Sequence, residues 1–281
     1  MKKSFICLLL SIIALGQTAF GAEKPAINPK ISPLASKVPL MHLNDIIEAN
    51  YDIEQEILLI QRLADYYGNG KLENACEYLG HVTKICSLAK EQLLKLTPTE
   101  KSVIVFDIDE TALTRFNYYY PQFIGSYQKY LKIRDPRMAI HPDRDLIYEL
   151  PAVLDLYNTA LKLGIKCIFL SISDAADIED RISELEATGF KHYAKLILPS
   201  TEQYECMLDE PHFIGQWKLE QRKKLAETHE IIMCVGDQDS DFEGGFTGIE
   251  VRIPNYMRRT YKKKAPADVK QDKKAPSDKA V

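Results

Sequence analysis

The sequence has few of the features that would assign it to a special structural class. It has only six cysteines among 281 residues, their spacing matches no zinc signature, and it contains no internal repeat. A hydrophobic fraction of 46% supports a packed core, and a charged fraction of 27% is ordinary for a soluble globular protein. The composition therefore allows one large domain or two small ones and does not select a fold class.

The apolar run near the start of the chain is too short to span a bilayer comfortably. Lys2 and Lys3 precede this run, which extends from Phe5 to Leu15, and Ala19-Phe20-Gly21 offers small residues at the two positions that a signal peptidase inspects. We therefore expect residues 1–21 to be a signal peptide, removed on export to the periplasm or the extracellular space, and we expect no stable membrane insertion. A retained anchor is the alternative, but no stop-transfer segment follows.

The distribution of charge argues against a nucleic acid polymer as the partner. The formal net charge is −4, and loss of Lys2 and Lys3 leaves −6. Because the tail from Lys262 to Val281 has seven lysines and three aspartates, the body of the protein carries about −10. We expect residues 258–281 to form a basic, disordered tail, with contact to anionic surfaces as the alternative.

The cysteines are too few to build a disulfide scaffold, and an odd number remains after the leader is removed. Cys167 and Cys234 lie in apolar runs typical of core strands, where cysteine acts as a small buried hydrophobe. Cys76 and Cys86 are the pair that best suits a disulfide.

The first part of the mature chain is predicted to be a linker followed by helices. Residues 22–40 contain four prolines and no periodicity, which predicts a flexible linker. In residues 41–98 apolar side chains recur at three- and four-residue intervals, which predicts helices that are interrupted at Gly68-Asn69-Gly70 and closed by Pro98.

From about residue 99 the pattern changes to alternating strands and helices. Val103 to Phe106 is a continuous apolar run typical of a strand buried on both faces. Further strands are predicted at 165–170, 196–199, 231–236 and 250–253, and helices at 150–163, 174–188 and 213–228. This alternation predicts an α/β fold with a parallel sheet flanked by helices, and such folds place their sites beyond the carboxyl ends of the strands.

The first of these strands ends in Asp107-Ile108-Asp109-Glu110-Thr111. Burial of two carboxylates at this point would cost several kcal/mol each unless the charge is compensated. Mg²⁺ takes oxygen ligands, so a bound Mg²⁺ is the simplest way to compensate the charge of these carboxylates. The alternative is that Asp109 or Thr111 only caps a following helix.

Two later strands also end in polar residues. Ser171-Ile172-Ser173-Asp174 could bind a phosphate oxygen at a helix N-terminus, although capping of the helix by Ser173 or Asp174 accounts for it better when it is taken alone. Asp237, Asp239 and Asp241 are three acids within five residues, which favours metal ligation over a solvated turn. The helix between these strands carries Lys218, Lys223 and Lys224; no periodicity distinguishes them, and a solvated lysine is the default for each.

Taken together, these motifs resemble the acid phosphatases of the haloacid dehalogenase (HAD) superfamily, of the bacterial class B and class C and plant vegetative-storage type (subfamily IIIB). The resemblance extends from about Ser102 to Met257. It rests on Val105-Phe106-Asp107-Ile108-Asp109-Glu110-Thr111-Ala112-Leu113, Phe169-Leu170-Ser171, Trp217-Lys218 with Arg222, Gly236-Asp237-Gln238 with Ser240-Asp241, and Ile253-Pro254-Asn255. It implies a Rossmann-like HAD core over residues 99–257, preceded by the N-terminal helical region.

The resemblance also implies the roles of the site residues. Asp107 would be the nucleophile that forms a phosphoaspartate, and Asp109 would be the general acid and then the general base. Ser171 and Lys218 would hold phosphate oxygens. The Mg²⁺ site would comprise Asp107, the backbone carbonyl of Asp109, and Asp237, with Asp241 supporting the metal or its waters.

Two positions depart from the family pattern. Ile172-Ser173 stands where many relatives have Gly-Arg, which weakens any transfer of substrate contacts near Ser171. Asp239 stands where the plant-like branch commonly has tryptophan, and it is expected to add negative charge near the metal. Neither position affects the acids that the chemistry requires.

The segment of about 113–149 is long and rich in aromatic residues, and it resembles the small cap that covers the site in this superfamily. Its aromatic side chains could stack on a nucleobase or an aryl group, or pack against the N-terminal helices. We expect packing for most of them and take Tyr118 and Tyr119 as the substrate contacts.

The function predicted from the sequence is that of an exported, Mg²⁺-dependent acid phosphatase for small phosphomonoesters, whether nucleotide, sugar or aryl phosphates. Phosphoryl transfer to an alcohol would use the same intermediate and is one alternative. A non-catalytic storage or binding protein on the HAD fold is another, and retention of both Asp107 and Asp109 argues against it. The sequence leaves the natural substrate and homo-oligomer formation open.

Overall fold

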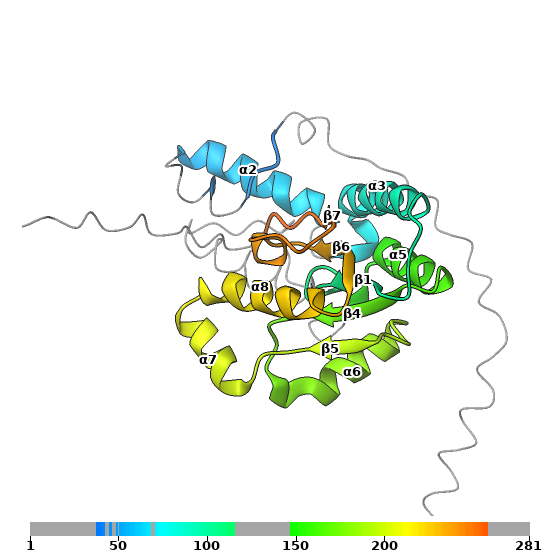
Figure 1. Cartoon of the computed structure of the whole chain (residues 1–281). Coiled ribbons are helices and arrows are strands. Elements are labelled where there is room, and N and C mark those ends of the chain that lie inside the picture. Colours follow the sequence, from blue (N-terminus) through cyan, green and yellow to red (C-terminus); the bar gives the residue numbers. More distant parts are fainter. Residues whose placement is uncertain are drawn as a thin grey trace, which may run out of the picture. The chain divides into compact units, whose positions relative to one another are not determined.

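The structure is a computed structural model that describes residues 38–42, 45–46, 49, 51–68, 71–115 and 147–257 (Figure 1). The predicted signal peptide at 1–21, most of the linker, the basic tail at 258–281, and Tyr118 and Tyr119 lie outside these residues. Among the described helices, none is both long enough and apolar enough to cross a membrane.

A five-stranded sheet forms the centre of the described fold, in the order β5-β4-β1-β6-β7. Each neighbouring pair of strands is parallel, so their carboxyl ends lie at one edge. The strands are β1 (Ser102–Phe106), β4 (Lys166–Leu170), β5 (Lys195–Ile197), β6 (Glu230–Gly236) and β7 (Ile249–Arg252). These strands occupy the predicted apolar runs to within one or two residues, so the prediction of an α/β fold with a parallel sheet is confirmed.

The sheet is buried on both faces, because alternate side chains of its central strand enter different clusters. Ile104 and Phe106 of β1 belong to the larger core cluster, together with residues of α3 (Cys76–Leu93) and α5 (Pro151–Lys162). Val103 and Val105 belong to a second cluster, together with residues of α7 (Thr201–Asp209) and α8 (Phe213–Ala226). A strand covered in this way needs apolar residues at every position, which explains its continuous apolar sequence.

The helices before β1 are α2 (Ile53–Tyr66), the short 3₁₀ helix η3 (Leu72–Asn74) and α3. Gly68 has a φ of +60°, a left-handed conformation that favours glycine, and a Cβ at this position would collide with the backbone of Ala75. The predicted break between the two helices is therefore confirmed. Both helices contribute side chains to the larger core cluster, among them Leu63 and Val82.

The expected disulfide between Cys76 and Cys86 is wrong. Both residues lie on α3 and both thiols are free. Ten residues of helix separate their Cα atoms by about 15 Å, whereas a disulfide requires roughly 4.4–6.8 Å. Cys167 and Cys234 are buried on β4 and β6, as predicted.

Two of the remaining helices begin directly after a residue whose side chain caps them. Asp174 accepts a hydrogen bond from Ala176 N and begins η5 (Ala175–Asp177), which leads into α6 (Ile178–Ala187). Helix α7 was not predicted, because Met207 is its one buried residue and no apolar periodicity results. Its start is marked by a capping box between Ser200 and Gln203, a signal that is present in the sequence.

A two-stranded antiparallel sheet brings together the two ends of the aromatic-rich segment. It pairs β2 (Leu113–Thr114) with β3 (Tyr148–Glu149). Residues 116–146 between them lie outside the described residues, so the assignment of a cap remains a prediction.

Candidate active site

Asp107 follows β1 directly and lies at the centre of the carboxyl edge of the sheet. Its backbone N–H donates to Val235 O at 2.9 Å, which continues the pairing with β6 beyond the end of β1. The residue is buried. Since β4 and β6 flank β1, residues that follow these two strands lie beside Asp107.

Three carboxylates converge at this edge from two parts of the chain. Asp107, Asp237 and Asp241 each offer an oxygen, and these oxygens lie within 4.8 Å of one another. Asp237 follows β6, and Asp241 ends the 3₁₀ helix η6 (Asp239–Asp241). A Cβ on Gly236 would collide with the carboxylate of Asp241, so glycine is required at this strand end.

Asp237 is held by two neutral donors. Thr111 Oγ1 donates to Asp237 Oδ1 at 3.3 Å, and Asn255 Nδ2 donates to Oδ2 at 2.8 Å. The alternative of a simple helix cap at Asp109 or Thr111 is wrong, because a turn and β2 follow these residues. Asn255 lies in the loop after β7, whose Tyr256 N–H donates to Tyr67 Oη at 2.8 Å.

Lys218 points into the group of carboxylates from α8. It is buried, and its Nζ lies 2.7 Å from Asp107 Oδ1 and 2.5 Å from Asp241 Oδ1. Lys223 and Lys224 on the same helix are exposed. The default of a solvated lysine is therefore wrong for Lys218 and correct for its two neighbours.

Burial and charge pull the ionisation of this group in opposite directions. Burial raises the pKa of Asp107 well above its ordinary value, and the charge of Lys218 offsets only part of this rise. Burial, followed by the charge of Asp241, raises the pKa of Asp237 to about 7. Burial would lower the pKa of Lys218, but the charges of Asp107 and Asp241 outweigh it and raise the pKa. Lys218 contacts two of the three carboxylates and Asp237 is held by neutral donors, so the group carries an excess of negative charge when all three acids are ionised.

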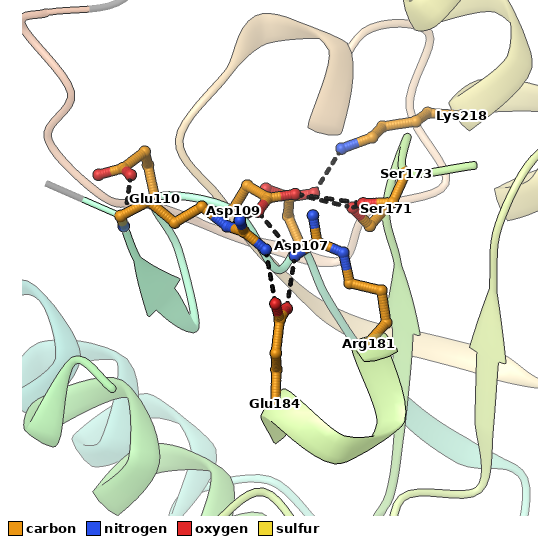
Figure 2. Close-up of polar contacts among 9 residues, drawn as sticks. Asp107, Asp109, Glu110, Ser171, Ser173, Arg181, Glu184 and Lys218 are labelled. Carbon is orange, nitrogen blue, oxygen red and sulfur yellow. Dashed lines mark hydrogen bonds and ion pairs between the residues drawn. The ribbon is translucent and has the colours of Figure 1, made fainter. Parts of the chain in front are cut away.

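The carboxylate of Asp109 contacts residues that follow β4 (Figure 2). Its Oδ2 accepts hydrogen bonds from Ser171 Oγ at 3.3 Å and Ser173 Oγ at 3.5 Å. Its Oδ1 accepts a hydrogen bond from Arg181 Nη1 at 3.0 Å. Ser173 thus contacts Asp109, while Asp174 caps the helix.

Asp239 does not join the carboxylate cluster. Its side chain is 63% exposed and pairs with Arg252 at 2.9 Å. The expectation that this residue adds negative charge near the metal is therefore wrong, because the exposed side chain has its own counter-charge.

Of the predicted site residues, the structure brings together Asp107, Asp109, Ser171, Lys218, Asp237 and Asp241 at one edge of the sheet. Sequence reasoning did not single out Arg115, Arg181 and Glu184, which surround Asp109. Arg181 contacts Asp109 across 72 positions, and Glu184 contacts Arg115 across 69. A single sequence carries no signal for such pairings.

Comparison with known proteins identifies a family whose match includes the region of this site. A family profile described as HAD superfamily, subfamily IIIB (acid phosphatase), matches residues 59–264. This match covers more than half of the chain and includes every described site residue. The chain belongs to this family.

Relatives of this family member include two stem glycoproteins from Glycine max. The "Stem 28 kDa glycoprotein" and a "Stem 31 kDa glycoprotein" are each 27% identical over 157 residues, which is 55% of this chain. The matched part spans 59% and 51% of the length of those two proteins.

Two solved structures of a class C acid phosphatase from Bacillus anthracis, one with tungstate bound, also resemble the chain. Each is 19% identical, and each comparison covers 71% of this chain and 85% of the other. The TM-scores are 0.48 and 0.49.

Proposed function

We propose that this family member is an exported, Mg²⁺-dependent acid phosphatase that hydrolyses small phosphomonoesters through a phosphoaspartate on Asp107. The observation that carries the proposal is the convergence of Asp107, Asp237, Asp241 and Lys218 in one buried group at the carboxyl edge of the sheet. Membership of an acid phosphatase family supports the same activity.

The donor set fits Mg²⁺. All the candidate side-chain ligands are carboxylate oxygens, which this hard cation prefers, and the excess of buried negative charge calls for a cation. Asp107 and Asp237 would hold the ion together with the backbone carbonyl of Asp109, and Asp241 would support it or its waters. When bound, Mg²⁺ would neutralise charge on the phosphoryl group and on the attacking carboxylate.

In the first step, a carboxylate oxygen of Asp107 attacks phosphorus and the bond from phosphorus to the leaving oxygen breaks. Asp109 donates a proton to that leaving oxygen, so the alcohol departs neutral. Ser171 Oγ, which donates to Asp109 Oδ2, and Lys218 Nζ, which donates to Asp107 Oδ1, would hold phosphate oxygens. Their donors stabilise the charge that gathers on the transferring group.

In the second step, Asp109 accepts a proton from a water molecule as that water attacks the phosphorus of the phosphoaspartate. The bond between phosphorus and the Asp107 oxygen breaks, which restores the Asp107 carboxylate and releases inorganic phosphate. An alcohol in place of water would give phosphoryl transfer through the same intermediate, so the proposal includes transferase activity as a side reaction.

A non-catalytic storage or binding role is the second candidate, and the stem glycoproteins among the relatives are the observation that favours it. This chain nevertheless keeps both Asp107 and Asp109, each in contact with further polar side chains. Tyr118 and Tyr119, between β2 and β3, remain our candidates for contact with the organic part of the substrate.

The test is hydrolysis of 4-nitrophenyl phosphate by the mature protein in Mg²⁺ or in chelator, beside Asp107→Asn. We expect activity that depends on Mg²⁺ and that falls by about 10⁴-fold or more in Asp107→Asn, because an amide cannot form the acyl phosphate. Retention of the activity in Asp107→Asn would overturn the mechanism. No activity of the wild type on a panel of nucleotide, sugar and aryl phosphates would favour the storage role.

A further inference from the structure

Four charged side chains form a connected network beside Asp109. Arg181 Nη1 lies 3.0 Å from Asp109 Oδ1 and 3.0 Å from Glu184 Oε2, one turn further along α6. Arg115 Nη2 lies 2.7 Å from Glu184 Oε1, and Arg115 Nε lies 3.6 Å from Asp109 Oδ1. Figure 2 shows Glu184 reaching up from α6 toward the groups that surround Asp109.

The two oxygens of Asp109 have different partners. Oδ1 faces the guanidinium of Arg181, and Oδ2 faces the hydroxyls of Ser171 and Ser173. With one oxygen held on each side, the carboxylate plane cannot rotate freely. Oδ2 is therefore the oxygen directed toward Ser171, and thus toward the expected position of the phosphate.

Arg115 is itself fixed at both ends. Its backbone N–H donates to Glu110 Oε1 at 2.9 Å, and Thr114 Oγ1 donates to Glu110 Oε2 at 2.8 Å. Glu110 has a left-handed φ of 58°, which is uncommon outside glycine and here turns its side chain back to these donors. Arg115 Nε is buried and has no hydrogen-bond partner among the described residues, so its N–H is available to Asp109 on a slightly closer approach.

Among the described residues, the four side chains of this network carry equal numbers of positive and negative charges. Two guanidinium groups face two carboxylates, and the exposed fractions of the four side chains range from 13% to 28%. A balanced network is not suited to capture the anionic phosphate itself, because its cationic charge is already matched. It is suited to hold one carboxylate in a fixed orientation.

We propose that Arg181 and Arg115, bridged by Glu184, are positioning residues that hold Asp109 so that its Oδ2 delivers the proton to the leaving oxygen. This inference rests on the proposed phosphatase function and adds three residues to it that act through Asp109. Ser173 stands where many relatives have arginine, and it offers Asp109 only a hydroxyl. In this chain the guanidinium that contacts Asp109 belongs to Arg181 on α6.

The proposal predicts a dependence on the leaving group. An alkoxide is a poor leaving group and needs the proton during bond cleavage, whereas 4-nitrophenolate departs with little help. The ratio kcat/KM reports the steps up to the first irreversible one, which include proton donation and formation of the phosphoaspartate. A misoriented Asp109 should therefore impair an alkyl phosphate far more than 4-nitrophenyl phosphate.

The experiment measures kcat/KM of the mature protein for 2-glycerophosphate and for 4-nitrophenyl phosphate, with saturating Mg²⁺. The variants are Arg181→Gln, Arg115→Gln, Glu184→Gln and Arg181→Lys. Lys90→Gln is the control, because it breaks an exposed ion pair with Asp155 between α3 and α5. A thermal melt of each variant identifies losses that come from unfolding.

We expect Arg181→Gln to lower kcat/KM for 2-glycerophosphate by about tenfold or more, and for 4-nitrophenyl phosphate by less than about threefold. Arg115→Gln and Glu184→Gln should shift the ratio of the two substrates in the same direction. Arg181→Lys, which keeps the charge and can still donate, should stay within about threefold of the wild type on both.

Equal losses on both substrates in a folded Arg181→Gln, or no loss on either, would overturn the positioning role while the phosphatase proposal stands. A wild type that hydrolyses neither substrate would overturn both. If Arg181→Gln does not fold, Arg115→Gln takes its place, and an unchanged substrate ratio in that variant would equally overturn the proposal.

Discussion

At the scale of single residues, the charge of the site depends on Lys218. Its ammonium is the cation in contact with both Asp107 and Asp241, and all three groups are buried. Burial alone would disfavour each charged form, so the lysine and the two carboxylates stabilise one another. Removal of Lys218 leaves two buried carboxylates without their shared cation.

Lys218→Met should therefore destabilise the protein in the absence of metal. We expect a loss of about 3–5 kcal/mol in the free energy of unfolding, because two buried carboxylates lose their shared cation. Urea denaturation in chelator measures this loss. Lys223→Met is the matched control, since Lys223 lies on the same helix and is exposed. Equal stability of the two variants would contradict the role of Lys218.

At the scale of elements, helix α8 shows why periodicity missed part of the site. Its buried residues include Lys218 and Arg222 beside Trp217 and Leu225, so polar side chains interrupt the apolar stripe. Arg222 is fully buried and donates to three backbone carbonyls, those of Ser240, Glu243 and Gly245. The loop that follows β6, and with it Asp241, is thereby fixed to α8.

Arg222→Lys should loosen that loop. A lysine cannot reproduce the planar fork of donors, so at least one of the three carbonyls loses its partner, at about 1–3 kcal/mol of folding free energy. Urea denaturation checks the loss, with Lys224→Met on an exposed position of the same helix as the control. An unchanged urea midpoint for Arg222→Lys would show that the loop does not depend on the fork.

The strands and the position of the site could be predicted, whereas the contacts around each acid could not. A strand buried on both faces must be apolar throughout, so β1, β4 and β6 stand out, and the parallel order brings their ends together. Arg181 and Glu184 lie on a highly charged helix where any acid or base looks solvated. Their role depends on Asp109, which lies more than seventy positions earlier and accepts a hydrogen bond from Arg181. Helical periodicity carries no information about such a pairing.

At the scale of the whole molecule, stability should depend on the ion that the site is proposed to hold. The carboxylates follow β1 and β6, and Asn255, which holds Asp237, comes from the last described loop. Binding to this assembled group can occur only in the folded protein, so the ion should stabilise the fold by mass action.

Free Mg²⁺ at about ten times its Kd should raise the free energy of unfolding by about 1.4 kcal/mol. A thermal melt with and without Mg²⁺ shows this as a rise in Tm. Asp237→Asn should lose most of the rise. Asp155→Asn, the same substitution at an exposed position on α5, should keep it, and an equal rise in both variants would argue against Asp237 as a ligand.

The strand order also fixes when the site can exist during synthesis. Asp107 comes much earlier in the chain than Lys218, Asp237 and Asp241, so it leaves the ribosome long before these partners. The sheet nevertheless places β1 between β4 and β6, so the site forms only when the later strands are present. Asp237 in turn waits for Asn255, close to the end of the described chain. A nascent chain that stops short of α8 therefore holds Asp107, the proposed nucleophile, without Lys218, Asp237 and Asp241, and one that stops short of β7 still lacks Asn255. The proposed phosphatase activity should therefore appear only when nearly the whole chain has been made, and partial products should be inert toward phosphate esters.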